Sequence, residues 1–384
     1  MEGTQQMKAG SIFALTLAAS ALLGGAAMAD EPFKIGVSAG LTGYAAAVDR
    51  SWRDGLEVAV DYVNSKGGVL GRKLELVVED NKSEPQEAVT VYRKMISSDH
   101  VGMFISGCVS AGNFAAAPFV VRAKIPMLLC SILPPQPEQV AWAYSFLAPP
   151  RFEVEKRYEY LKNHTQIQSV GVLHDPSPYA NLQKDMAVKA APNYGITVPV
   201  VEQYKQDDAD FSTQISKMES ANAHAVIKIG LGGSTLTVAK NIKQLGLSTL
   251  LLGSIDDLAV LKPAGETLGN QFLFVAAPSQ VYDALPNGAL KTEIGRFLPL
   301  WKAKQGERDA FWAGKAWDAV MVTVEAIEAA KSFDGEKIRA AVETLPPHQG
   351  TGGVYNFSPT VHQGITTNPF FMGAFEGGKV VVKD

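Results

Sequence analysis

The residues best placed to bind a ligand lie in segment 107–113, Gly-Cys-Val-Ser-Ala-Gly-Asn, which joins an apolar run ending at Ser106 to a predicted helix. Parallel sheets bind ligands beyond the carboxyl ends of their strands. We therefore expect the backbone N–H groups near Ser110 and Ala111, with the Ser110 hydroxyl, to face a ligand, and a helix N-terminus favours a carboxylate. Ser110 as an ordinary helix N-cap is an equally good interpretation, and the two are compatible.

Patterns that would support catalysis are weak. The six histidines include no pair four residues apart and no cluster with cysteine, so a metal site is the weaker alternative. The glycine-rich segment 230–234 is neither a dinucleotide-binding nor a phosphate-binding loop, and it is interpreted as a turn that passes close to a cleft. Asp256 and Asp257 could act as an acid/base pair, but a solvated loop is the commoner explanation. We expect no nucleophile turn, no enzyme activity, no cofactor and no metal.

The elements that must position these residues alternate along the chain. Apolar runs of a few residues separated by amphipathic segments predict a parallel sheet covered on both faces. Strands are expected at 33–38, 73–79, 101–106, 125–129, 169–174, 197–203, 225–229, 249–252 and 272–276. Helices are expected at 51–64, 84–97, 113–123, 152–163, 179–191, 211–222, 235–245, 290–305, 311–331 and 336–345. The pattern restarts after Pro149 and Pro150, which indicates an α/β fold of two doubly wound lobes with a cleft between them.

One stretch identifies a family. Segment 64–80 ends a helix at Gly67 and Gly68, turns again at Gly71 and enters a strand, because glycine adopts left-handed backbone angles without steric cost. With segments 33–43 and 84–89, it resembles the opening of type I periplasmic solute-binding proteins, the branched-chain amino acid-binding family. The resemblance covers essentially the whole chain after the leader and implies a Venus-flytrap fold with a three-crossing hinge. The crossings are expected near Leu147, Ala277 and Tyr355, which gives one lobe of residues 30–147 and 277–355 and another of 148–276 and 356–384.

The same resemblance implies a function. Members capture a small molecule by hinge closure and deliver it to the permease subunits of an ABC importer in the inner membrane, without catalysis. We expect a monomer that binds a small-molecule carboxylate or amino acid. A sensor subunit that presents its ligand to a receptor has the same fold and is the alternative.

The resemblance also suggests ligand-binding residues. Ser131 occupies a position whose backbone and side chain contact the ligand in relatives, and Tyr179 occupies that of a tyrosine lying over it from the second lobe. Leu133 stands near a hydroxyl residue that grips the α-carboxylate of an amino acid. The acid that holds the ammonium aligns near Ile255 or Asp256.

Relatives have an acidic residue at the start of the second lobe, and in this chain the segment around Arg151 stands there instead. Arg151 is either a surface side chain or a partner for a ligand carboxylate. Aromatic side chains could add stacking faces, although each is more often part of a core: Tyr44, Phe114, Phe152 and Tyr179. These departures weaken an ammonium site and keep the donors for an anion. They favour an organic carboxylate, above all an aromatic acid, with a branched-chain amino acid as the alternative.

The first 29 residues have the pattern of a signal peptide. A short start with Lys8 precedes an apolar run, 12–23, that is too short to span a bilayer, and Ala27-Met28-Ala29 fits a cleavage site. A buried N-terminal helix is the weaker alternative. No cysteine lies near the cleavage point, so we expect a periplasmic protein that is not a lipoprotein. The formal net charge of −4 without a basic run argues against nucleic acid as a partner.

Cys108 and Cys130 are the two cysteines of the chain. Each follows an apolar run, and the two runs are expected to form neighbouring strands. Relatives often pair a cysteine near position 108 with one in the loop around Ser83, and this chain has none there. A bridge between Cys108 and Cys130 is therefore left open, because it requires Cα atoms within about 7 Å.

Overall fold

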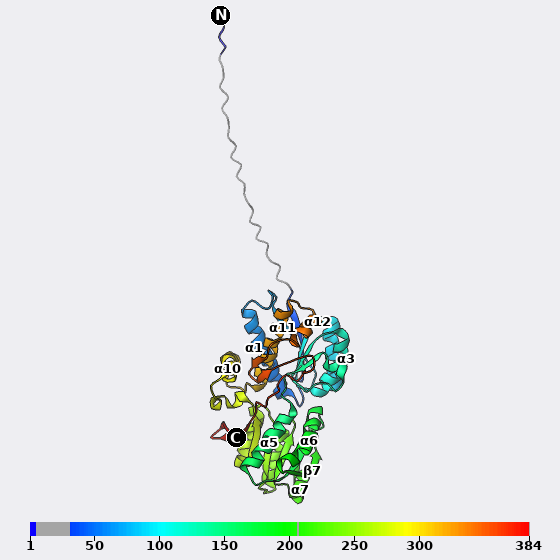
Figure 1. The fold of residues 1–384 in the computed structure, drawn as a ribbon, viewed down its shortest axis with the longest axis vertical. Helices are drawn as coiled ribbons and strands as arrows, with labels where there is room; N and C mark the ends of the chain where they lie inside the picture. Colours follow the sequence, from blue (N-terminus) through cyan, green and yellow to red (C-terminus); the bar gives the residue numbers. More distant parts are fainter. Residues whose placement is uncertain (5–30, 206, 384) are drawn as a thin grey trace.

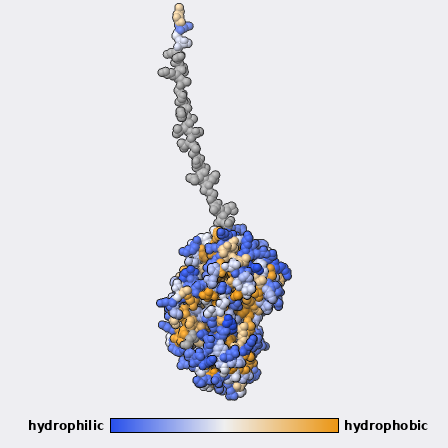
Figure 2. Space-filling view, in the orientation of Figure 1, coloured by the Kyte–Doolittle hydropathy of each residue, from blue (hydrophilic) through white to orange (hydrophobic). Residues whose placement is uncertain are grey.

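The computed structural model describes residues 1–4, 31–205 and 207–383. Two lobes are stacked along the long axis of the folded part, with α1, α3, α11 and α12 in one and α5, α6, α7 and β7 in the other (Figure 1). All but the first four residues of the expected leader lie outside the described part. Hydrophilic residues predominate on the visible face, and apolar residues are scattered among them (Figure 2). Within the described ranges no helix is long and apolar enough to cross a membrane.

The first lobe is built on a five-stranded sheet in the order β2-β1-β3-β4-β5. All its neighbouring strands are parallel, because the intervening helices return the chain to the same edge. Its strands are β1 (Phe33–Ala39), β2 (Leu74–Asp80), β3 (Met103–Ser106), β4 (Met127–Leu129) and β5 (Ala143–Ser145). Its helices are α1 (Ala46–Ser65), α2 (Pro85–Lys94), a π-helical turn (Met95–Asp99), α3 (Ser110–Ala123) and α4 (Pro137–Val140).

The second lobe is built on a seven-stranded sheet in the order β14-β13-β10-β9-β8-β6-β7. Five strands are parallel: β6 (Ser169–His174), β7 (Thr197–Gln203), β8 (Ala225–Ile229), β9 (Leu250–Gly253) and β10 (Phe272–Ala276). Two antiparallel strands extend one edge: β13 (Phe371–Glu376) and β14 (Lys379–Val382). The helices are α5 (Pro150–His164), α6 (Pro178–Ala190), α7 (Ser212–Ser220), α8 (Ser234–Gln244) and α9 (Leu258–Leu268), with 3₁₀ turns at Ala191–Tyr194 and Gly269–Gln271. The expectation of two lobes with parallel sheets is thus confirmed.

The C-terminal segment between β10 and β13 returns to the first lobe. It contains a 3₁₀ segment (Pro278–Ala284), α10 (Ala289–Gln305), α11 (Phe311–Ala330), α12 (Gly335–Val342) and a small hairpin of β11 (His348–Gly350) and β12 (Gly353–Tyr355). Gln363 still forms a β-bridge with Ser145 of β5. The last passage to the second sheet therefore lies between Gln363 and β13, later than Tyr355.

Helix α11 packs lengthwise on α1, although the two come from opposite ends of the chain (Figure 1). Fifteen of its residues are buried, as its continuous apolar sequence predicts. A Cβ atom added to Gly55 of α1 would lie 2.4 Å from the carbonyl oxygen of Ala313. Only glycine permits this approach, which fixes α11 against the first sheet and sets the position of its first turn at the cleft.

Several elements differ from expectation. Helix α1 begins at Ala46 rather than at 51, and α3 begins at Ser110 rather than near Asn113. The strands β5 and β11–β14 and the helix α9 were not predicted. Three of these strands have only three residues each, too few for an alternating pattern to be visible. Their existence depends on pairing with strands that are distant in sequence.

Candidate functional site

A cavity lies where the carboxyl ends of the two sheets face each other. Counted with its opening to solvent, the space between its lining atoms is about 500 Å³. The first sheet and its loops contribute Tyr44, Cys108, Ser110, Cys130 and Leu147, the second Asp175, Ser177, Tyr179, Gly230, Leu231 and Ile255, and α11 contributes Trp312.

The lobes touch beside this cavity. A Cβ atom added to Gly232 would lie 3.4 Å from the carbonyl oxygen of Tyr44, so a chain segment of the second lobe is in contact range of the first. Gly230 and Gly232 have φ angles of 124° and 83°, which glycine adopts without strain. The expectation that this glycine-rich turn passes close to the cleft is confirmed.

Ser110 is the first residue of α3, and the N-cap is Val109, which forms no side-chain capping bond. The interpretation of Ser110 as an ordinary N-cap is therefore wrong. Its side chain is buried against the cavity, and it forms no hydrogen bond within the described residues. The hydroxyl and the first N–H groups of α3 are thus available to a ligand at the positive end of a 14-residue helix.

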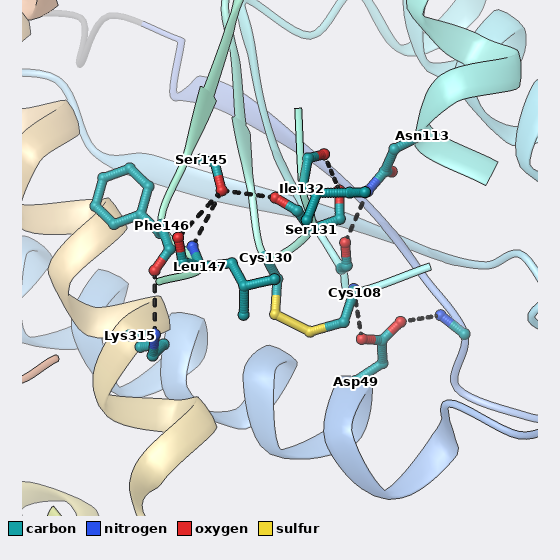
Figure 3. Close-up of a disulfide and its surroundings, with 12 residues drawn as sticks. Asp49, Cys108, Asn113, Cys130, Ser131, Ile132, Ser145, Phe146, Leu147 and Lys315 are labelled. Carbon is teal, nitrogen blue, oxygen red and sulfur yellow. Dashed lines mark hydrogen bonds between the residues drawn. A yellow bond between two sulfur atoms is a disulfide. The ribbon is translucent and has the colours of Figure 1, made fainter. Parts of the chain in front are cut away.

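Cys108 and Cys130 form a disulfide, with their Cα atoms 4.5 Å apart (Figure 3). The bridge is possible because β3 and β4 are neighbours in the sheet. It ties together the loops at the carboxyl ends of both strands and forms part of the cavity wall. The pairing that the sequence left open is thereby settled.

Asp49 of α1 holds the backbone of these loops through hydrogen bonds. Its carboxylate accepts the N–H of Gly40 at 2.6 Å and that of Cys108 at 2.7 Å (Figure 3). Burial raises the pKa of Asp49 to about 6, against the opposing effect of these two bonds. One carboxylate thus fixes the backbone after β1 and after β3, and with it the wall that carries Ser110.

Ser131 lies behind this wall in a hydrogen-bonded network (Figure 3). Its hydroxyl accepts the side-chain N–H of Asn113 at 2.9 Å and its carbonyl accepts the hydroxyl of Ser145 at 2.7 Å. Asn113 also donates to the carbonyl of Gly107 at 2.9 Å. The network positions the ends of β3, β4 and β5, and the side chain of Ser131 is outside the cavity lining.

Tyr179 enters the cavity from the first turn of α6 and is held from behind. It donates its hydroxyl to Glu153 and accepts an N–H of Gln183 at 2.9 Å. Glu153 forms a buried pair with Arg157 at 2.8 Å. Burial, reinforced by Glu153, raises the pKa of Tyr179 well above its usual value. The ring is therefore a fixed, neutral face of the cavity.

Asp175 follows β6 and is a charged residue of the lining. It accepts the N–H of Ser177 at 2.8 Å, and the hydroxyl of Ser177 caps α6 by accepting the N–H of Ala180 at 3.2 Å. Buried Lys228 donates to the carbonyl of Gly230 at 2.8 Å. Burial lowers the pKa of Lys228 to about 8, and Asp256 and Asp175 oppose that change. The carboxylates of Asp175 and Asp256 thus have the ammonium group of Lys228 beside them inside the protein.

The structure brings together three of the residues predicted for the site, Tyr44, Ser110 and Tyr179. Burial and the nearby Asp175 raise the pKa of Tyr44, so its hydroxyl stays neutral. The other five predicted residues are outside the lining: Ala111, Ser131, Leu133, Arg151 and Asp256. All eight residues remain predictions as ligand contacts.

Asp256 and Asp257 do not form the solvated loop that was expected. Both are buried, and Asp256 accepts the N–H of Gly232 at 2.8 Å while Asp257 caps α9 through the N–H of Ala259 at 2.8 Å. Burial raises the pKa of Asp256 to about 6. Ile255, the neighbour of Asp256, faces the cavity instead.

Arg151 lies at the start of α5 with its side chain 47% exposed. It pairs with Glu155 at 3.0 Å and stacks over the ring of Phe152 at 4.1 Å. Its charge therefore has a partner one helical turn away, outside the cavity.

Residues 36–40, Gly-Val-Ser-Ala-Gly, match the G-x-S-x-G spacing of a nucleophile turn, contrary to the expectation that the chain has no such motif. Ser38 lies inside β1, fully buried, and accepts the side-chain N–H of Asn81 at 3.1 Å. A nucleophile turn would place the serine on an exposed bend between a strand and a helix, so this match has no catalytic geometry. Among the described residues, no three His, Cys, Asp or Glu side chains form a group that could hold a metal ion.

Sequence reasoning missed Asp175, Ser177 and Trp312. The first two follow the carboxyl end of a strand that was predicted with correct bounds, so their position was a usable signal. Trp312 offered none, because both faces of its helix are apolar.

The chain is similar to known proteins along most of its length. A family model described as a periplasmic binding protein matches residues 32–379. The leucine-, isoleucine-, valine-, threonine- and alanine-binding protein of Pseudomonas aeruginosa is 25% identical over 348 residues, 88% of this chain and 91% of that protein.

Solved structures show the same fold. An extracellular ligand-binding receptor from Rhodopseudomonas palustris superimposes with a TM-score of 0.84 at 21% identity, covering 92% of this chain and 99% of the other. An ABC transporter solute-binding protein from R. palustris in complex with benzoate superimposes with a TM-score of 0.76 at 18% identity, covering 91% and 95%. The chain therefore belongs to the type I periplasmic binding proteins, in the branched-chain amino acid-binding family.

Proposed function

We propose that this protein captures a small organic carboxylate with an aromatic body in the cavity between its lobes and delivers it to the permease subunits of an ABC importer. The observation that carries the proposal is Ser110, whose free hydroxyl stands at the N-terminus of α3 in the cavity wall. A carboxylate there would receive hydrogen bonds from the hydroxyl and from backbone N–H groups.

The rest of the lining favours an apolar body over an ammonium group. Leu147, Leu231, Ile255 and Trp312 provide apolar surface, and Tyr179 adds a fixed ring. Asp256 is the acid nearest the position expected to hold an ammonium. Its carboxylate already accepts two backbone N–H groups, and it is outside the cavity lining. A buried ammonium without a charged partner would cost several kcal/mol. The benzoate complex of the R. palustris neighbour supports an aromatic acid as a ligand that this fold can accept.

A branched-chain amino acid is the second candidate, and Asp175 favours it. This carboxylate lines the cavity and could accept an ammonium, and the P. aeruginosa relative is named for binding leucine, isoleucine and valine. Against it, Asp175 already accepts the N–H of Ser177 and has Lys228 beside it. Asp175 therefore needs no cation from the ligand, and an aromatic carboxylate, the first candidate, supplies none.

The mode of action follows from the two lobes. We propose that the molecule moves as two lobes about three crossings. One lobe comprises residues 30–147 and 277–355, and the other comprises residues 148–276 and 356–384. The boundary at 355/356 is shifted to a point beyond Gln363. A ligand that touches both lobes stabilises the closed form. The proposal includes export by cleavage after Ala29, a monomeric periplasmic state, and no enzyme activity; the sensor role is the alternative for the partner.

A thermal-unfolding screen after removal of bound ligand tests the ligand class. Benzoate and cinnamate should raise the melting temperature by a few degrees, since a ligand at a hundred times its Kd stabilises by about 2.7 kcal/mol. Leucine, isoleucine and valine should have little effect. Ser110→Ala should reduce the shift given by the acids, and Ser358→Ala, at a half-buried serine outside the cavity lining, serves as the matched control. A shift with leucine and none with either acid would replace the first candidate by the second.

A further inference from the structure

The indole N–H of Trp312 is a hydrogen-bond donor for which the described part of the chain provides no acceptor. The side chain is 3% exposed, and its Nε1 atom is buried without a hydrogen-bond partner. Indole nitrogen can only donate, and a buried tryptophan usually finds an acceptor for it. A buried donor that stays unpaired costs stability.

Other tryptophans in the same region are satisfied. Trp301 donates to the carbonyl of Arg308 at 2.9 Å, and Trp317 donates to Glu293 at 3.3 Å. Trp52 is also buried with an unpaired Nε1, but it lies in the core of the first lobe and outside the cavity. Among these four, Trp312 is the one that lines the cavity, so the side chain that carries the unpaired donor is part of the cavity wall.

The position of Trp312 is fixed on both sides. Its ring packs on Phe311 at a centroid distance of 4.6 Å. Asp309 accepts the N–H of Phe311 at 3.0 Å and that of Leu258 at 2.9 Å, which anchors the first turn of α11 to α9 of the second lobe. A side chain held in this way is already oriented before a ligand arrives, which lowers the entropic cost of binding.

We propose that Trp312 donates a hydrogen bond from Nε1 to an oxygen of the bound ligand and thereby selects among ligands of similar shape. The inference rests on the proposed function, because it takes the cavity as the ligand site. The oxygen belongs either to the ligand carboxylate or to a second oxygen, such as a hydroxyl, on the apolar body. A ligand with no oxygen at this point leaves the donor unpaired and binds less tightly.

The test compares Trp312→Phe with the native protein by calorimetry. The probes are benzoate, 3- and 4-hydroxybenzoate, 4-methylbenzoate and leucine. Phenylalanine keeps the aromatic wall and removes the donor, so at least one bound probe should lose about tenfold in affinity, equivalent to 1.4 kcal/mol. An equal loss for every probe assigns the bond to the carboxylate. A loss confined to a hydroxybenzoate, with 4-methylbenzoate unchanged, assigns it to a second oxygen. Trp52→Phe, the matched control, should change no affinity by more than twofold.

A second measurement requires no ligand. Both Trp312→Phe and Trp301→Phe remove ring volume from the interior, which lowers stability. Only Trp301→Phe also loses a formed hydrogen bond, so ligand-free Trp312→Phe should lose less in melting temperature than Trp301→Phe. Binding of all probes within twofold of native, or a melting temperature lowered as much as that of Trp301→Phe, overturns the inference. Absence of any acid binding to the native protein instead rejects the proposed ligand class, and leucine and the melting temperatures then decide the role of Trp312.

Discussion

Asp309 accepts the backbone N–H of Leu258 at 2.9 Å with one carboxylate oxygen while the other accepts the N–H of Phe311 at 3.0 Å. One side chain thus binds the N–H of the first residue of α9, which packs on the second sheet, and that of α11, which packs on the first lobe. Gln280 adds a third bond to the same carboxylate at 2.7 Å. The contact lies where the chain passes from one lobe to the other, so it couples the relative position of two helices to a single acid.

Asp309→Ala should therefore destabilise more than the loss of an ordinary cap. Several donors would be left without an acceptor, and we expect the free energy of unfolding to fall by about 2 to 4 kcal/mol. Asp334→Ala is the matched control, because Asp334 caps only α12 through the N–H of Lys337 at 3.0 Å, and about 1 kcal/mol is expected there. Urea unfolding measures both, and equal losses would contradict a role for Asp309 beyond one helix.

Reduction of the disulfide should destabilise the first lobe. The bridge closes a loop with a sequence separation of 22, for which the chain-entropy model gives about 3 kcal/mol. Replacement of both cysteines by serine should lower the free energy of unfolding by that amount. Reductant should then have no further effect on the double variant, while it lowers the stability of the native protein; an equal response of both proteins to reductant would exclude the disulfide as the cause.

Asp49 should make stability depend on pH. Burial raises its pKa to about 6 in the folded protein, above the ordinary value of about 3.9. The folded state then binds more protons than the unfolded state between about pH 4 and 6, so the contribution of Asp49 to stability falls as the pH rises through that range. A shift of about two pKa units corresponds to about 3 kcal/mol as an upper estimate.

The measurement is the difference in unfolding free energy between the native protein and Asp49→Asn at several pH values. The native protein should lose stability relative to the variant from pH 4 to 7 and show a constant difference above pH 7. Asp61→Asn, at an exposed position of the same helix, is the control. A difference that does not vary with pH would show that the carboxyl of Asp49 is not shifted.

Arg151→Ala should leave ligand affinity within twofold of native. The side chain is half exposed and bound to Glu155 outside the cavity, and an exposed pair of this kind contributes about 0.5 kcal/mol or less to stability. Calorimetry with whichever ligand the screen identifies provides the test. A loss of about 2 kcal/mol or more would restore the alternative in which Arg151 holds a ligand carboxylate.

The sequence predicted the sheets better than the site, for a physical reason. The strands β6, β8 and β10 have the predicted bounds, because buried parallel strands are continuous apolar runs. Strand β7, at the edge of the sheet, also has the predicted bounds, although it is partly exposed. Strand β5 escaped prediction because its three residues are defined by pairing with β4 and by the bridge to Gln363. Contacts between distant segments of this kind are invisible to a local pattern.

The site residues show the same difference between what a local pattern indicates and what depends on distant contacts. Ser110 was predictable because it follows a strand end at the start of a helix, and Tyr179 was suggested by the family resemblance. Trp312 was not, since α11 is apolar on all sides and periodicity cannot indicate which residue of such a helix faces a cleft. The alignment placed an acid near Ile255 or Asp256 without separating the two. In the structure Ile255 lines the cavity, and Asp256 accepts the N–H of Gly232.

The contact of Gly55 with Ala313 makes the first lobe depend on both ends of the polypeptide. The parallel strands of the second lobe are contiguous in sequence from Ser169 to Ala276, so they can assemble as soon as that stretch is complete. Helix α1, in contrast, keeps an uncovered apolar face until α11 has been synthesised. A nascent or C-terminally truncated chain therefore holds an unfinished lobe with exposed apolar surface. Completion of the first lobe therefore waits for the C-terminal part of the chain.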